Sequence, residues 1–248
     1  MKLMKSSKKT DSTTFLTTMT SEPHMLARIN YNLINKEKIQ QIFSKLKCMD
    51  YDSTHDRWVW LYDGEAKKIK FNVKYHQIPK EISPIILGYF FSKSNETMYL
   101  DVDSFDRAKE AIEFFHKYIP VTVSKATDII ILNRLFDSYD ETPPKHEDYF
   151  DKAHIEMKDT EKVLNELQNS VSSIEDTTKK LEALTILLEK DAQKPLPEIE
   201  KLPIHFYEEG IIGLDGALSM REIVALQHWK GNKNYTFYDL IRNQGRGH

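Results

Sequence analysis

Residues Leu164–Leu188 read LNELQNSVSSIEDTTKKLEALTILL and constrain the architecture of this 248-residue chain more than any other stretch. They lie in a run from Ile155 to Lys190 that contains neither glycine nor proline. Apolar residues recur at intervals of three, four and seven, a spacing that gives a helix one apolar stripe in need of a partner. We therefore predict a long helix or coiled coil over residues 154–192. Its interface consists of Leu164, Leu167, Val171, Ile174, Leu181 and Leu188.

A second arrangement of the same stretch stays open. Thr178 and Thr185 interrupt the apolar stripe, and a break near Ser172–Thr178 would fold the helix back on itself as a hairpin. A continuous helix of roughly 36 residues would extend about 54 Å at 1.5 Å per residue, well beyond a small domain. The sequence is compatible with both the coiled coil and the hairpin.

Residues 23–137 carry the patterns of an α+β domain. Apolar and polar residues alternate from Leu26 to Leu33, as in a strand with one buried face. Helices are expected after Asn35 and from Ser104, each of which is a good N-cap residue. We predict an antiparallel sheet with both helices on one face, in a ferredoxin-like or pseudo-duplicated order. The other expected strands are Arg57–Tyr62, Lys68–Tyr75, Ile85–Phe91, Met98–Val102 and Thr127–Leu132.

The remaining segments connect or extend these two parts. We expect a disordered arm at 1–22, a linker at 138–153, a proline-rich connector at 193–204 and a helical docking tail at 205–248. In the tail, Ser219 opens a capping box and Thr236 can cap a second helix. So short a tail cannot form its own core, so it must dock on the first domain, on the long helix or on another protein.

From the composition we expect a cytoplasmic protein that does not partner with a membrane. Hydrophobic residues make up 40% of the chain, and no apolar run reaches the length of a membrane span. Cys48 has no second cysteine to pair with, which fits a reducing compartment. The net charge of −3 is unevenly spread, because residues 138–201 hold 16 acidic and 9 basic residues. The helical region is therefore the acidic part, and a strongly basic footprint for nucleic acid is absent.

The most specific candidate for a catalytic or metal-binding site is Asp101-Val102-Asp103 at a strand end. Alternate aspartates there can place two carboxylates on one side, where a metal ion would bind them. The simpler interpretation is that Asp103 or Ser104 caps the following helix. No nucleotide-binding glycine motif and no zinc-spaced histidine or cysteine cluster occurs, so we predict no cofactor and no catalytic residues.

A nucleic-acid surface is a further candidate, near the C-terminus. Aromatic residues alternate with cations there, so rings could stack on bases while the cations contact phosphates. The candidate binding residues are Lys230, Lys233, Tyr235, Arg242 and Arg246.

Three functional hypotheses follow. The first is a non-catalytic interaction or adaptor subunit that assembles with itself or with a protein partner through its long helix and tail. The second is a nucleic-acid-binding accessory protein that uses the basic aromatic tail. The third is a metal-dependent phosphoryl-transfer enzyme at Asp101 and Asp103.

Overall fold

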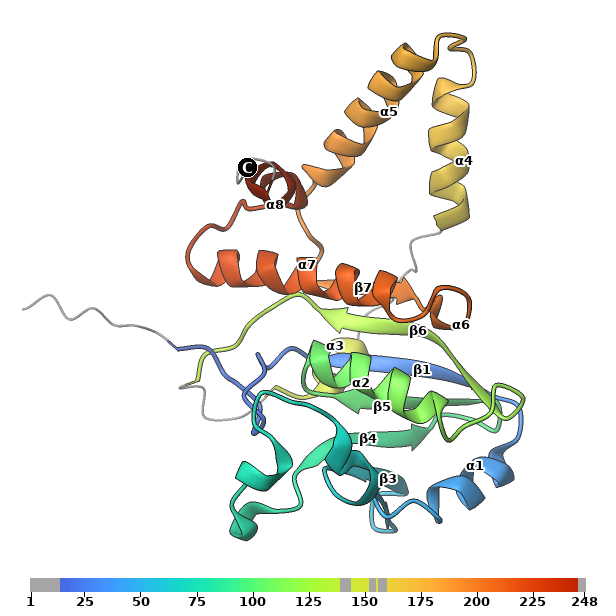
Figure 1. Cartoon of the computed structure of the whole chain (residues 1–248), viewed down its shortest axis with the longest axis vertical. Helices are drawn as coiled ribbons and strands as arrows, with labels where there is room; N and C mark the ends of the chain where they lie inside the picture. Colours follow the sequence, from blue (N-terminus) through green and yellow to red (C-terminus); the bar gives the residue numbers. More distant parts are fainter. Residues whose placement is uncertain (1–13, 139–143, 152–154, 156–159, 245–248) are drawn as a thin grey trace, which may run out of the picture.

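A seven-stranded antiparallel sheet forms the body of the protein (Figure 1). The computed structural model describes residues 14–138, 144–151, 155 and 160–244, and for residues 160–164 and 244 it describes the backbone alone. The strand order is β2-β3-β4-β5-β1-β6-β7, so β1 lies between β5 and β6. The strands are β1 (Ala27–Leu33), β2 (Met49–Asp52), β3 (Arg57–Leu61), β4 (Ile86–Ser92), β5 (Thr97–Val102), β6 (Ser124–Leu132) and β7 (Ile199–Pro203).

The mixed α+β class is as predicted, but the sheet is larger than expected. Neither the ferredoxin-like nor the pseudo-duplicated order is confirmed by this seven-strand arrangement. Two strands were not predicted: β2 pairs with β3, and β7 lies within the predicted proline-rich connector and pairs with β6. Pro203 of β7 stands at the edge of the sheet, where a residue without an N–H group does not interrupt a ladder.

Three helices cover one face of the sheet and enclose the main core. α1 (Lys36–Phe43) and α2 (Phe105–His116) are the two that the sequence predicts, and α7 (Ile212–Trp229) joins them. Leu214 and Leu218 of α7 are buried in this core together with Phe43 of α1 and Phe115 of α2. The helical tail therefore docks on the first domain through α7.

The helix starts at α1 and α2 follow from their N-caps. The Asn35 side chain accepts a hydrogen bond from the Lys38 backbone N–H at 2.9 Å. Ser104 does the same for the N–H of Arg107 at 3.1 Å. In α7 the expected start at Ser219 is wrong, because the helix begins at Ile212 and Ser219 lies inside it. The apolar residues before Ser219 contact the core, and this tertiary packing extends the helix beyond the local capping signal.

The predicted strand Lys68–Tyr75 is wrong. Residues 69–74 have no regular secondary structure and connect two short 3₁₀ helices, η1 (Gly64–Lys68) and η2 (Tyr75–Gln77), after which η3 (Lys80–Ile82) follows. The expected alternation is present in the side chains, since Ile69 and Phe71 are buried while Lys70 is exposed. However, β3 forms its hairpin with β2 and not with this segment. The alternation of buried and exposed side chains therefore arises here without any strand pairing.

A buried ion pair lies on the face of the sheet opposite α2. Arg28 of β1 donates from Nε and Nη2 to the two carboxylate oxygens of Asp101 on β5, at 2.7 and 2.9 Å. It also pairs with Asp151, and its guanidinium lies 4.1 Å from the ring centre of Tyr99. The short helix α3 (His146–Phe150) packs against β1 on this side.

The long helix predicted over 154–192 is two helices, α4 (Thr160–Val171) and α5 (Thr177–Ala192), which contact each other. Polar side chains near the break bond to the backbone and so compete with a continuous helix. Asp176 accepts hydrogen bonds from the N–H groups of Thr178 and Lys179 and thereby starts α5. Ser172 donates its hydroxyl hydrogen to the Asn169 carbonyl at the end of α4. The folded-back hairpin is the arrangement adopted, and the coiled coil is not confirmed.

Two further helices complete the C-terminal part. α6 (Phe206–Glu209) precedes α7, and α8 (Phe237–Gln244) follows it. α8 contacts both α7 and α5. The tail thus connects the sheet to the helical hairpin.

Candidate protein-interaction site

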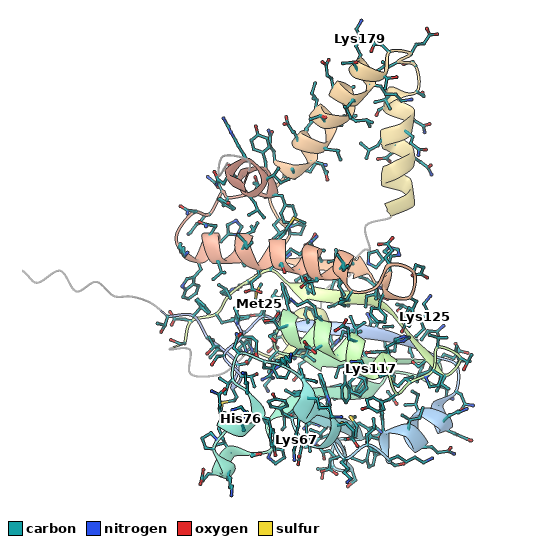
Figure 2. All side chains as sticks on the ribbon, in the orientation of Figure 1. Met25, Lys67, His76, Lys117, Lys125 and Lys179 are labelled. Carbon is teal, nitrogen blue, oxygen red and sulfur yellow. The ribbon has the colours of Figure 1, made fainter. Side chains whose placement is uncertain are left out.

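The α4–α5 hairpin, which we call the arm, extends away from the sheet (Figure 1). In Figure 2, Lys179 marks the far end of the arm, whereas Met25 lies in the body of the protein. No residue of α5 is buried, although the helix contains four leucines and an isoleucine. Most helices of globular proteins are stabilised by packing an apolar face, and an isolated helix of this length is marginal in water. The arm therefore has unused apolar surface.

α5 is apolar on two sides. At about 100° per residue, Ala183, Leu184 and Leu187 share one side of the helix, and all three are half-buried. The other side carries Leu181 and Leu188, which are 65% and 56% exposed. α4 packs on α5, whereas the second stripe stays mostly exposed although α8 lies beside it, and Ile186 is exposed as well.

This second stripe forms one wall of an apolar groove. α8 supplies the other wall, so the groove lies between the arm and the end of the tail. Its volume is about 490 Å³. The lining residues are Thr185, Leu188, Glu189 and Ala192 of α5, with Tyr238, Ile241 and Arg242 of α8.

The six predicted interface residues do not form one continuous seam. Leu181 and Leu188 are exposed, whereas Val171 at the end of α4 is only 2% exposed. Leu167 and Ile174 are half-buried. The side chain of Leu164 lies outside the part of the structure that is described. The break in the helix therefore divides the predicted stripe between the hairpin contact and the groove.

Sequence reasoning did not assign Tyr238 and Ile241 of α8 to the interface. Ile241 is 59% exposed, an unusual position for an isoleucine next to an apolar groove. The available signal was the helical spacing of Phe237, Leu240 and Ile241 in the tail. That spacing predicts a helix but cannot show that its outer side meets α5.

The basic aromatic residues of the tail do not form a stacking surface. Tyr235 is half-buried, and its hydroxyl accepts a hydrogen bond from Asn243 at 3.4 Å. Phe237 lies under the Arg221 guanidinium at 5.3 Å, and Trp229 contacts Phe15 edge to face. These rings are therefore used in packing.

The cations of that tail are spread over different places. Lys230 and Lys233 are exposed at and just after the end of α7, and Arg242 lies in the groove. Arg246 lies outside the described residues. Of the predicted nucleic-acid-binding side chains, Lys230, Lys233 and Arg242, which the structure describes, do not form one cluster.

The two aspartates of the metal hypothesis have other partners. Asp101 is buried and bonds to Arg28 through both oxygens. Asp103 lies 3.7 Å from Arg107 and 3.9 Å from His146. Within the described ranges, no group of three or more histidine, cysteine or acidic side chains is arranged to hold a metal ion. Ser104 caps the start of α2, as the simpler interpretation of this string expects.

Cys48 is a buried structural residue. Its thiol is inaccessible, and burial, together with the nearby Glu65, raises its pKa to about 12. A thiol held in the neutral form is a poor nucleophile.

Comparison of the chain with protein-family models, with curated proteins and with solved structures found no match in any of the three. Among the described residues, no helix has the length and apolarity needed to cross a membrane.

Proposed function

We propose that this protein is a non-catalytic interaction subunit whose groove between α5 and α8 receives an amphipathic helix of a partner. The observation that carries the proposal is the apolar stripe of α5, which lines a groove but buries none of its side chains. A third helix laid between two existing helices is a common way for proteins to recognise one another.

The apolar surface in the groove can supply useful binding free energy. Leu188 and Ile241 are both more than half exposed. Full burial of a leucine or isoleucine side chain is worth about 1.5–3 kcal/mol, so covering the exposed halves of both gives about 2 kcal/mol. Contacts along the rest of the stripe add to this, and the arm gains order when its free side is covered.

The other two hypotheses have less support. The tail rings are packed against the body and the candidate cations are dispersed, so nothing in their geometry favours nucleic acid. Asp101 is engaged by a buried arginine, which leaves the Asp-x-Asp string without two free carboxylates.

The test is direct binding of a model helix to the full chain. The probe is a fluorescein-labelled peptide of about 18 residues, five turns of helix, with leucines at i, i+3, i+4 and i+7 and glutamines elsewhere. We expect saturable binding by fluorescence anisotropy. A peptide with every leucine replaced by glutamine is the matched probe and should not bind.

Variants locate the site. Leu188→Glu places a charge in the groove and should weaken binding at least tenfold, about 1.4 kcal/mol. The control is Ile212→Glu, because Ile212 is 80% exposed on α7 and does not line the groove. Equal binding by the wild type and the Leu188→Glu variant would show that the groove is not the site.

A further inference from the structure

Two glutamates border the apolar stripe of α5 on one side. Glu182 and Glu189 each follow a leucine of the stripe by one position, and they are seven residues apart. Two turns of helix separate them, so they lie on the same edge of the stripe. Measured around the helix axis from Thr185 at the middle of the stripe, Glu182 lies at about 60° and Glu189 at about 40° on the same side. Glu189 also lines the groove.

These carboxylates are free to meet a partner. Among the residues that the structure describes, neither Glu182 nor Glu189 has an ion pair, and both side chains are exposed. Lys179 precedes Glu182 by about one turn, whereas Lys180 lies on the opposite side of the helix and Lys190 lies further round it from Glu189. The border of the stripe is therefore acidic, as is the surrounding region of 16 acidic and 9 basic residues.

The acidic border disfavours the antiparallel pairing of two copies of this chain through α5. In an antiparallel pair centred on Thr185, Glu182 of one copy would face Glu189 of the other. In a parallel pair, the glutamate edge of one copy would face the opposite edge of the other, so the glutamates would not meet each other. Like charges flanking a helical seam are unfavourable by a few tenths of a kcal/mol for each pair, and they decide the choice of partner.

We infer that the groove receives a helix from a different protein, and that this helix carries lysine or arginine along the flank that meets α5. This inference rests on the proposed function of the groove. Opposite charges at such flanking positions set partner choice and orientation in helical assemblies. Arg242 on the α8 wall lines the same groove, so a residue of the bound helix that approaches this wall should be a glutamate or neutral, and not a second cation.

The experiment uses three labelled peptides that share one leucine stripe and differ only at the positions flanking it on the α5 side: lysine, glutamine or glutamate. For the wild-type chain we expect the lysine peptide to bind most tightly and the glutamate peptide most weakly, with dissociation constants about tenfold apart, a difference of about 1.4 kcal/mol. The Glu182→Lys/Glu189→Lys double variant should reverse the order. Both sites are exposed, so the double variant should fold normally.

The outcomes separate the two proposals. Equal binding of the three peptides, lost in Leu188→Glu, would overturn the charge preference but leave the groove as a helix-binding site. A glutamate peptide that binds most tightly to the wild type would also overturn it. Binding of no peptide would overturn both proposals. Light scattering of the purified chain should give the 29.1 kDa monomer, and a dimer that Leu188→Glu dissociates would replace the foreign helix with a second copy.

Discussion

Leu188 of α5 and Ile241 of α8 line the same apolar groove although they belong to helices separated by a strand and two other helices in the chain. Both side chains are more than half exposed. Their joint position connects the arm to the C-terminal tail and creates a surface that neither helix offers alone.

The first prediction is that substitutions in the groove weaken binding without lowering the stability of the fold. Because Leu188 and Ile241 are exposed, Leu188→Glu and Ile241→Glu should each change the free energy of unfolding by less than about 0.5 kcal/mol. Both should nevertheless weaken binding of the leucine-stripe peptide. Urea denaturation and fluorescence anisotropy on the same preparations measure the two effects. A large loss of stability would mean that these side chains serve the fold instead.

The buried ion pair of the sheet should matter for stability. Burial alone would lower the pKa of Arg28, but its hydrogen bond to Asp101 and the charges of Asp101 and Asp151 raise it above the usual value. Asp101→Asn removes the negative charge that balances the buried guanidinium. It should lower the free energy of unfolding, measured by urea denaturation, by about 3 kcal/mol. The control is Asp52→Asn, whose partner Arg57 is more exposed and whose loss should cost clearly less. Equal effects would argue against a special role of burial.

Stability should fall in mild acid because of His24. Burial lowers the pKa of His24 below its ordinary value of 6.5, with His146 and Arg107 acting in the same direction against the opposite effect of Asp103. Below pH 6.5 the unfolded chain therefore binds a proton at this residue before the folded chain does. The free energy of unfolding decreases as the pH falls from 6.5 through the lowered pKa.

Replacing the histidine isolates this contribution. His24→Leu cannot titrate, so its urea midpoint should change less than that of the wild type between pH 7.5 and pH 5. The control is the same replacement at an exposed histidine, His76→Leu. A pH dependence that is identical in the wild type and His24→Leu would contradict the prediction.

Two glycine-to-alanine replacements should change the stability of the fold in opposite directions. A Cβ atom at Gly88 in β4 would lie 2.6 Å from the Asp101 carbonyl oxygen and 2.8 Å from Cγ1 of Val102. Gly88→Ala should therefore destabilise the sheet by about 2 kcal/mol. At Gly216, inside α7, nothing lies within 4 Å, so Gly216→Ala should stabilise by about 0.5–1 kcal/mol. Thermal unfolding of the two variants beside the wild type measures both shifts, and shifts of the same sign would contradict this explanation.

Several elements were predictable because their signals are local. The strands β1, β4, β5 and β6 combine apolar alternation with turns at their ends, and their pairing satisfies those patterns. Asn35 and Ser104 cap the helices they precede. In each case the side chains that determine the element lie within one or two turns of chain.

The errors arose where distant parts of the chain decide the outcome. Ile69 and Phe71 alternate with polar residues, but β3 pairs with β2 and β4, so this segment finds no place in the sheet. β7 lies between prolines and gains its hydrogen bonds only from β6. Such pairings depend on which strand edges remain open after the body has folded.

The candidate site was predicted in part for the same reason. The heptad pattern identifies Leu181 and Leu188 as apolar positions in need of a partner. The break near Ser172–Thr178, which Asp176 caps, was one of the two arrangements that the sequence left open, whereas the approach of Ile241 from the tail was not predictable. The polar break converts one long stripe into a hairpin contact and a groove.

The location of binding is tested most directly by hydrogen–deuterium exchange of the full chain with and without the lysine-flanked peptide. If the groove is the docking site, exchange should slow in α5 and α8, whereas β1 and β5 in the sheet should keep their rates. The same experiment with Leu188→Glu should show no slowing. Unchanged exchange in α5 at saturating peptide, or protection confined to the sheet, would contradict the assignment of the groove as a helix-binding site.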